Sequence, residues 1–256
     1  MSTCPGAPAS TKDQILNTGA SMSQNFAPVN QICAHLFAYH VYASDHTRCV
    51  QANHYCSQLT PGKSASRPHD APCAQLTYHI KDMRQCLIYD SHEKPARLIG
   101  VEYMITPKLF ETLPESERKL WHSHVYEVKS GMLVMPSNVP AAVWNKAETA
   151  EMEQVIPLYG KTYHLWQVDR GDEVPMGAPE LMVSFTSDKD VERAQSGGVQ
   201  TLFDKTKQSF GIDCRHKAEL RKDLKEPDIH PGMSSLDCVG RVLADRDEDA
   251  DSKLPK

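Results

Sequence analysis

Residues 96–131 read ARLIGVEYMITPKLFETLPESERKLWHSHVYEVKSG, and the residue pattern along them changes from strand to helix. The first part, through Ile105, is rich in Val, Ile and Tyr, which favour a pleated strand. Pro107 and Pro114 each suit the first turn of a helix, where a missing N–H costs nothing. The stretch therefore predicts one strand followed by two helices, the second of which ends near Gly131.

Further strand and helix patterns lie on both sides of this stretch. Three strands are expected before it, and together with residues 96–105 they suit an antiparallel sheet; they cover residues 32–42, 49–59 and 85–90. After it, three more strands are expected, a short one at 132–136 and two at 162–168 and 181–185, and helices at 147–156, 199–209 and 217–224. This order predicts an α+β fold, mainly an antiparallel sheet packed with several helices in a single domain.

The composition is that of a globular protein with polar ends. Of 256 residues, 40% are hydrophobic and 24% charged. Residues 1–25 are rich in Ser, Thr, Ala, Gly and Pro, and residues 243–256 form an acidic charge run, so both predict disordered tails around a domain at 26–242. The net charge of -5 and the lack of a basic block predict that nucleic acid is not a partner.

Compartment and cysteine state are predicted together. No window reaches the about 18 uninterrupted apolar residues of a membrane span, and no signal peptide pattern opens the chain, so we expect a cytoplasmic protein without a transmembrane segment. In that compartment the eight cysteines are expected to be thiols, and no CxxC pair suggests structural zinc. Cys56 is interpreted as an inert buried thiol rather than a nucleophile.

The segment KLWHSHVYEVKSG, residues 119–131, holds the most concentrated functional signal. Trp121, Val125 and Val128 follow helical spacing, and on a helix His124 and Glu127 share one face. On a strand, His122 and His124 share a face instead and Glu127 turns away, as in the HxH start of cupin barrels. In either geometry two of the three groups can converge.

We interpret His122, His124 and Glu127 as candidate catalytic residues. With His54 they are the predicted ligands of a divalent metal, iron, zinc or manganese, since such a mixture leaves coordination positions open. His35 and His164 are further candidate donors. Without a metal, a His and Glu pair can act as acid and base.

Other polar residues are given structural interpretations. Glu102, inside an apolar strand, is expected to face outward, because burying an unpaired carboxylate is costly. The turn around Gly171 is expected to hold local salt bridges. The remaining histidines are interpreted as surface or core residues; they are His40, His46, His69, His79, His92, His216 and His230.

Residues 96–136 resemble the oil-body-associated protein family, long described as a domain of unknown function. The likeness extends back through HYC at 54–56 and RQCLIYDS at 84–91, and forward through 159–184, so it covers most of residues 30–230. Residues 57–76 resemble an insertion relative to that family. His54 matches a histidine of the family pattern, whereas the pattern has a cysteine at the position of His164.

Two functions remain open on this evidence. One is an enzyme, metal-dependent or acid–base, that acts on a small and apolar molecule in oxygenase-type chemistry or secondary metabolism. The alternative, which the resemblance implies, is a noncatalytic protein that associates peripherally with lipid droplets or oil bodies. No strongly basic amphipathic helix is evident for that attachment.

Overall fold

The computed structural model describes residues 8–59 and 82–233, so the predicted acidic tail, most of the 57–76 insertion, His69 and His79 lie outside the described residues. The strands are β1 (Ala34–Tyr42), β2 (Cys49–Leu59), β3 (Met83–Tyr89), β4 (Leu98–Ile105), β5 (His122–Ser123), β6 (Tyr159–His164) and β7 (Glu180–Val183). The helices are α1 (Thr11–Ser23), α2 (Pro107–Phe110), α3 (Glu115–Arg118), α4 (Val125–Lys129), α5 (Ala141–Val155), α6 (Asp188–Ala194), α7 (Gly198–Phe210) and α8 (Cys214–Leu220).

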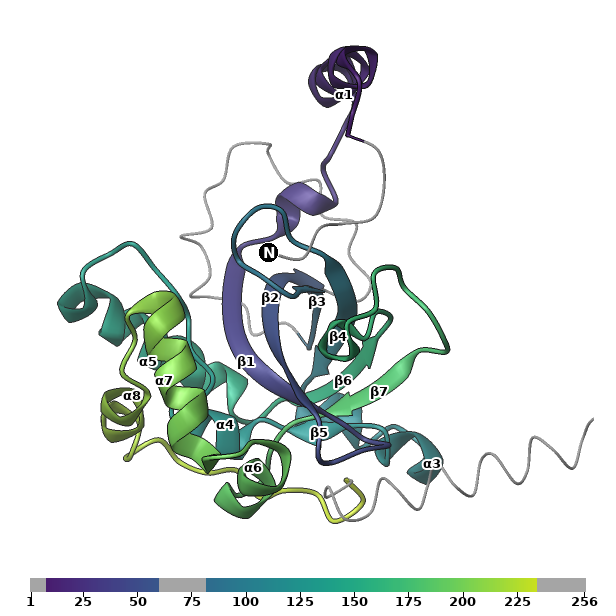
Figure 1. Ribbon diagram of the computed structural model, residues 1–256. Coiled ribbons are helices and arrows are strands. Elements are labelled where there is room, and N and C mark those ends of the chain that lie inside the picture. Colours follow the sequence, from purple (N-terminus) through teal and green to yellow (C-terminus); the bar gives the residue numbers. More distant parts are fainter. Residues whose placement is uncertain (1–7, 60–81, 234–256) are drawn as a thin grey trace, which may run out of the picture.

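The predicted antiparallel sheet closes into a barrel. Strands pair in the order β4-β3-β2-β1-β7-β6, and a further antiparallel pairing between β4 and β6 joins the two ends. β5 and β7 both pair with the edge of β6 that faces away from β4, β5 with the first residues of β6 and β7 with the last (Figure 1). The predicted α+β fold with a mainly antiparallel sheet is confirmed in its coarse form, but the sheet is a closed barrel rather than a layer packed with helices. Closure removes the exposed edges that such a sheet would present.

Strand register decides which side chains point into the barrel. Residues that face each other across antiparallel strands lie on the same side of the sheet. The pairs Leu36↔His54, His54↔Ile88 and Ile88↔Gly100 therefore place four strands in one register. Following it around the barrel gives an inward set that includes His40, His54, Arg84, Glu102, Thr162 and His164.

Helices cover one side and one end of this barrel. Outward residues of β1 and β7 pack in one apolar cluster with α6 and α7, and the Tyr39 hydroxyl donates to the Leu202 carbonyl at 3.0 Å. At the end of the barrel, Met152 and Val155 of α5 join the inward residues of β1 in a second cluster. The predicted helix at 147–156 corresponds to α5, which begins earlier and buries one face. Among the helices of the described ranges, none combines the length and apolar character needed to cross a bilayer.

The first 25 residues contain a helix where a disordered tail is predicted. Ser10 and Asp13 form a capping box at the start of α1, which satisfies N–H groups that would otherwise lack partners. No residue of α1 is buried, and in Figure 1 the helix stands apart from the barrel. Part of the predicted tail thus forms a local helix without packing on the barrel.

The prediction of a single helix at residues 114–130 is wrong. This segment forms two short helices, α3 and α4, with the strand β5 between them. Pairing of His122 with Gly160 and of Ser123 with Tyr159 draws the chain into the sheet at this point. Long-range pairing thus outweighs the local helical spacing of the apolar residues.

One disulfide corrects the expectation that all cysteines are thiols. Cys56 and Cys86 are directly opposite in the β2–β3 register, with Cα atoms 4.0 Å apart, and their sulfurs are bonded. Cys49 and Cys214 are thiols, as expected. Cys56 is therefore neither an inert thiol nor a nucleophile, the two roles weighed for it from the sequence.

A buried ionic cluster joins α5 to α8 and holds the end of the barrel closed. The Glu148 carboxylate accepts from Arg221 at 3.1 Å, from the Met135 N–H at 2.9 Å and from Lys217. Arg221 also donates to two backbone carbonyls near α4, and its side chain is 1% exposed. Charges this deeply buried are stable only when each is paired and hydrogen-bonded.

A histidine and glutamate cluster inside the barrel

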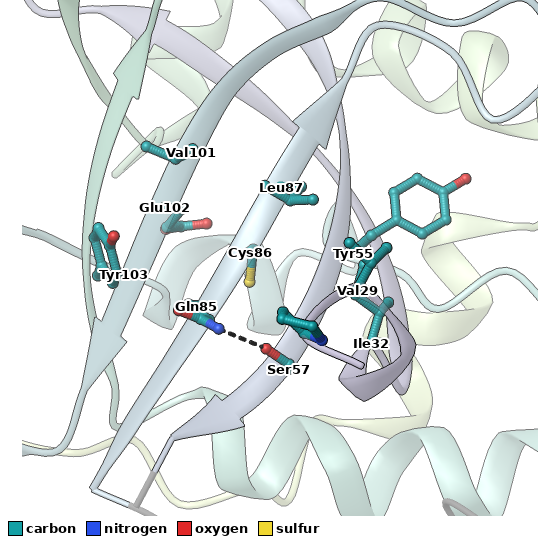
Figure 2. A pocket seen from close by; sticks show the side chains of 11 residues that line it. Val29, Ile32, Tyr55, Ser57, Gln85, Cys86, Leu87, Val101, Glu102 and Tyr103 are labelled. Carbon is teal, nitrogen blue, oxygen red and sulfur yellow. Dashed lines mark hydrogen bonds between the residues drawn. The ribbon is translucent and has the colours of Figure 1, made fainter. Parts of the chain in front are cut away.

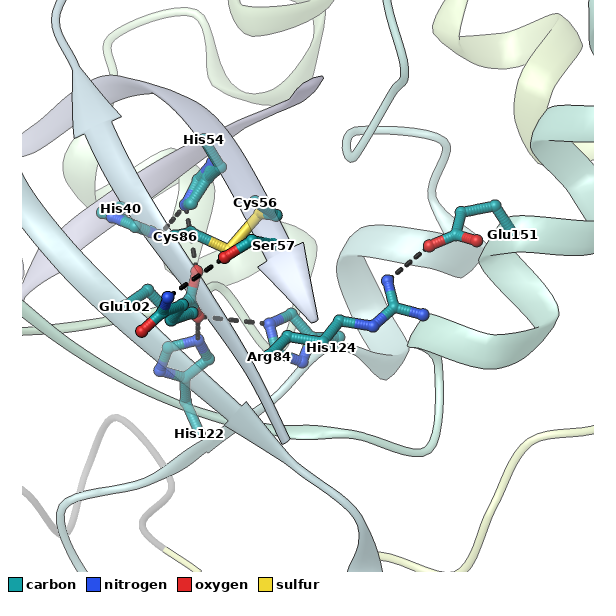
Figure 3. The surroundings of a disulfide bond; sticks show 11 residues. His40, His54, Cys56, Ser57, Arg84, Cys86, Glu102, His122, His124 and Glu151 are labelled. Carbon is teal, nitrogen blue, oxygen red and sulfur yellow. Dashed lines mark hydrogen bonds and ion pairs between the residues drawn. A yellow bond between two sulfur atoms is a disulfide. The ribbon is translucent and has the colours of Figure 1, made fainter. Parts of the chain in front are cut away.

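The buried cluster is built by residues from six different elements. β1 supplies His40, β2 supplies His54, β4 supplies Glu102, β5 supplies His122, the N-cap of α4 supplies His124, and β6 supplies His164. Each of these six residues is at most 2% exposed. Figure 3 shows His40, His54, His122 and His124 arranged around the Glu102 carboxylate.

Glu102 is the centre of the cluster. Its Oε2 lies 3.1 Å from His54 Nε2, whereas Oε1 lies 3.2 Å from His122 Nε2 and 3.4 Å from His124 Nε2. Both carboxylate oxygens thus face ring nitrogens in a space without water access. Such an arrangement can hold a divalent cation or share protons between acid and base.

The three histidines on β1, β2 and β6 form a chain. His54 Nε2 lies 3.1 Å from His40 Nε2, and His40 Nδ1 lies 3.1 Å from His164 Nε2. A single proton on His54 Nε2 can be shared between Glu102 and His40, and a proton on His40 Nδ1 can be donated to His164. Hydrogen bonds therefore link the three rings, although His54 Nδ1 and His164 Nδ1 have no partner within the described part of the chain.

Two glycines create the space that the cluster occupies. A Cβ atom at Gly160 would collide with Glu102 Oε1 and lie 2.7 Å from His122 Nε2 and 2.9 Å from His124 Cε1. At Gly100 a Cβ atom would lie 2.8 Å from His164 Cδ2. Inward positions of a small barrel are normally filled by side chains. The missing side chains at Gly100 and Gly160 therefore leave room for the histidine and glutamate cluster.

Burial and the shared carboxylate shift the pKa values in opposite directions. Burial lowers the pKa of His40 and of His122, and it lowers that of His164 to about 3. Burial also disfavours charged His124, but the carboxylate of Glu102 outweighs it and raises that pKa. Glu102 is the converse case, because the surrounding imidazoles outweigh its burial and hold its pKa well below the ordinary value.

The structure separates the predicted site residues into two groups. It brings His54, His122 and His124 together, and it adds His164 through His40. Glu127 is buried on α4, where burial raises its pKa to about 7, but it does not belong to either group of converging ligand atoms in the described residues. His35 faces outward, stacked on Tyr55 and 3.1 Å from Asn53 Oδ1.

Sequence reasoning missed His40 and assigned Glu102 to the wrong face. The expectation that Glu102 faces outward is wrong, because four imidazoles nearby compensate its burial. The available signal is the alternation of side chains along a strand. His40 lies an even number of residues from inward Leu36 and Ala38, and Glu102 lies two residues from Gly100, so each shares the inward face. This alternation identifies a face, but only the register between strands shows that these faces line one interior.

A separate pocket lies on the outer face of the same strands. Its volume is about 230 Å³, and it is lined mainly by outward residues of β2, β3 and β4, among them Tyr55, Leu87 and Val101, together with Cys86 and Glu102 of the inward register (Figure 2). Val29 and Ile32, on and just after the 3-10 turn η1 (Val29–Gln31), complete its border. Most of its lining side chains therefore lie on the face of the strands opposite the histidine cluster.

Comparison with known proteins identifies close relatives along most of the chain. A family model described as "Protein of unknown function (DUF1264)" matches residues 26–71 and 64–225. Oil body-associated protein 1B of Arabidopsis thaliana is 40% identical over 229 residues, which cover 89% of this chain and 82% of the relative. Oil body-associated protein 1A of Zea mays is 39% identical over 229 residues, with 89% and 83% covered. No solved structure matches the chain.

Proposed function

The chain belongs to the oil body-associated protein family, as its sequence predicts, and on this premise we propose that it associates peripherally with the surface of oil bodies or lipid droplets. The observation that carries the proposal is the similarity to relatives named for oil bodies over about nine tenths of the chain. A feature of α1 supports it and suggests how contact is made.

Helix α1 carries an apolar stripe, formed by Ile15, Leu16 and Met22, which are 68%, 59% and 83% exposed. Ile15 and Met22 lie at i and i+7 on one side of the helix, and Leu16 lies beside them. Phe26, which follows α1, is also 43% exposed. A lipid surface would remove these side chains from water without unfolding the barrel.

Replacing both Ile15 and Leu16 by glutamate is expected to release the protein from oil bodies. Burial of one large aliphatic side chain is worth roughly 1.5–3 kcal/mol, so losing two should lower the bound fraction at least about 10-fold. The measurement is flotation of the purified full-length chain with isolated oil bodies in a density gradient, with bound and free protein quantified.

The matched control is the Asn17→Glu, Ser21→Glu double variant, which adds the same charge on the opposite face of α1. It is expected to float as the unmodified chain does. Equal loss of flotation in both variants would show that charge rather than the apolar stripe decides attachment. Failure of the unmodified chain to float would overturn the proposal itself.

A second candidate function is an enzyme that acts inside the barrel on a small, apolar molecule. The observation that favours it is the convergence of His54, Glu102, His122 and His124, an arrangement that a surface-binding protein does not require. Either acid–base chemistry or a bound metal ion would suit these groups.

A further inference from the structure

We infer that the barrel holds one divalent transition-metal ion, bound by Glu102 Oε1, His122 Nε2 and His124 Nε2. This inference does not depend on attachment to a lipid surface. The ion would be the cofactor of the enzyme described as the second candidate function. In the inferred ligand set, Glu102 takes the place of Glu127, the carboxylate ligand predicted from the sequence. The three ligand atoms all lie within 4.8 Å of one another.

The spacing of these atoms matches that of ligands around one ion. With metal–ligand bonds of about 2.0–2.1 Å, two ligands are about 3.0 Å apart at a right angle and about 3.4 Å apart at the tetrahedral angle. The observed separations from Glu102 Oε1 are 3.2 Å to His122 and 3.4 Å to His124. Two of the three ligand separations thus fit an ion bound between these atoms.

Hydrogen bonding does not explain this half of the cluster. Glu102 Oε1 and His122 Nε2 are buried and have no hydrogen-bond partner, although they are only 3.2 Å apart. Buried polar atoms without partners are rare and call for a specific explanation, such as an ion. A cation bound between the two atoms provides it.

The tautomer of His124 adds a second argument. Its Nδ1 lies 2.9 Å from the Leu158 carbonyl oxygen, which can only accept, so Nδ1 carries the proton. In the neutral ring, Nε2 then presents a lone pair toward the negatively charged Glu102 Oε1. A metal ion between these two atoms would give the usual arrangement of a histidine ligand, whose other ring nitrogen donates to a second-shell carbonyl.

The neighbouring residues support the same position. His54 contacts the other oxygen of Glu102 and serves as a positioning residue, since ligating carboxylates are commonly hydrogen-bonded in this way. Gly160 leaves room at the point where the three ligand atoms converge. His40 and His54 also converge with Glu102, but there the facing nitrogens His54 Nε2 and His40 Nε2 are already hydrogen-bonded to each other, and His40 Nδ1 to His164 Nε2.

The donor set indicates the class of metal. Two imidazoles and one carboxylate suit Zn²⁺, Fe²⁺ or Mn²⁺, and three protein ligands leave coordination positions for water or a small molecule. Because the three side chains are at most 3% exposed, exchange of the ion with solvent should be slow. The protein is therefore expected to retain its metal through purification.

Elemental analysis of the full-length protein, purified without chelator or affinity metal, tests the inference directly. We expect about one equivalent of zinc, iron or manganese per chain. Removing it with a chelator should lower the Tm by about 10 °C, and adding the same metal back should restore it, because an ion bound only by the folded state stabilises that state. This readout requires no knowledge of a reaction.

Two isosteric variants distinguish the ligand set. Glu102→Gln is expected to lower metal content at least 10-fold, whereas Glu127→Gln, a buried carboxylate outside the converging atoms, should retain about one equivalent. Circular dichroism of both variants establishes that they are folded. If Glu102→Gln does not fold, His122→Gln serves in its place, since it keeps the backbone pairing of β5.

Two results would overturn the inference. One is an unmodified protein that is purified without metal and whose Tm does not change on adding Zn²⁺, Mn²⁺ or, under anaerobic conditions, Fe²⁺. The other is loss of metal from Glu127→Gln but not from Glu102→Gln. Neither result affects the flotation experiment, so failure of this inference is distinguishable from failure of the lipid-surface proposal.

Discussion

Replacing Arg221 by alanine is expected to lower the free energy of unfolding by about 3–5 kcal/mol, the usual cost of removing one member of a buried ion pair. The guanidinium donates to the carbonyls of Val128 and Leu133 at 3.1 and 2.8 Å and to Glu148 at 3.1 Å. All three acceptors would lose a donor in a place that water does not reach. Urea denaturation followed by circular dichroism measures the change.

The neighbouring Lys222 provides the control for Arg221. It lies on the same short segment and forms an ion pair with Glu219, but both side chains are exposed. Since exposed pairs contribute little, Lys222→Ala should leave the urea midpoint unchanged. Equal midpoints for Arg221→Ala and Lys222→Ala would contradict a structural role for the buried ionic cluster.

A loss of this size would affect more than one helix. Folded proteins are stable by only about 5–15 kcal/mol, so the Arg221 variant would lose a large part of the total. The guanidinium connects the end of α8 to the chain on both sides of Gly131, and Glu148 extends the connection to α5. Because α5 packs on the end of the barrel, loosening this cluster should also loosen the interior.

The first four strands were predictable from sequence because each carries its own local signal. Runs rich in Val, Ile and Tyr, bounded by polar turns, give β1 to β4 almost to the residue. Closure of the barrel carries no such signal. It rests on pairing between Leu98–Ile105 and Tyr159–His164, which are far apart along the chain, and no periodicity within either strand reveals its partner.

The candidate site was predictable only in part, for the same reason. The HxH pattern drew attention to His122 and His124, and the family likeness added His54. Helical spacing then pointed to Glu127 as the carboxylate, because the pairing of His122 with Gly160 cannot be seen locally. Once that pairing fixes β5 as a strand, the nearest inward carboxylate is Glu102, on the other side of Gly160.

The disulfide illustrates a different limit. The expected cytoplasmic location predicts thiols for all cysteines, and this inference takes no account of where the cysteines lie in the fold. Cys56 and Cys86 become neighbours only when β2 and β3 pair in the register that also aligns His54 with Ile88. A one-residue shift of β2 would turn Cys56 and His54 to the outer face while Cys86 stayed inward, so the bond could not form.

Replacing Gly160 by alanine is expected to abolish metal binding and to destabilise the fold by about 1–3 kcal/mol, the usual cost of overpacking an interior. The added methyl group would occupy the point between Glu102 Oε1, His122 Nε2 and His124 Cε1. It would thus force apart the atoms that the proposed ion requires. Metal content by elemental analysis and the urea midpoint are the two measurements.

Thr162→Val on the same strand is the matched control for Gly160→Ala. Thr162 also points inward and is fully buried, but its hydroxyl has no hydrogen-bond partner, so an apolar isostere loses nothing. This variant should keep its metal and unfold at the same or a higher urea concentration. If Gly160→Ala instead bound one equivalent as tightly as the unmodified chain, the ion would have to lie elsewhere, because a methyl group and a metal ion cannot share this space.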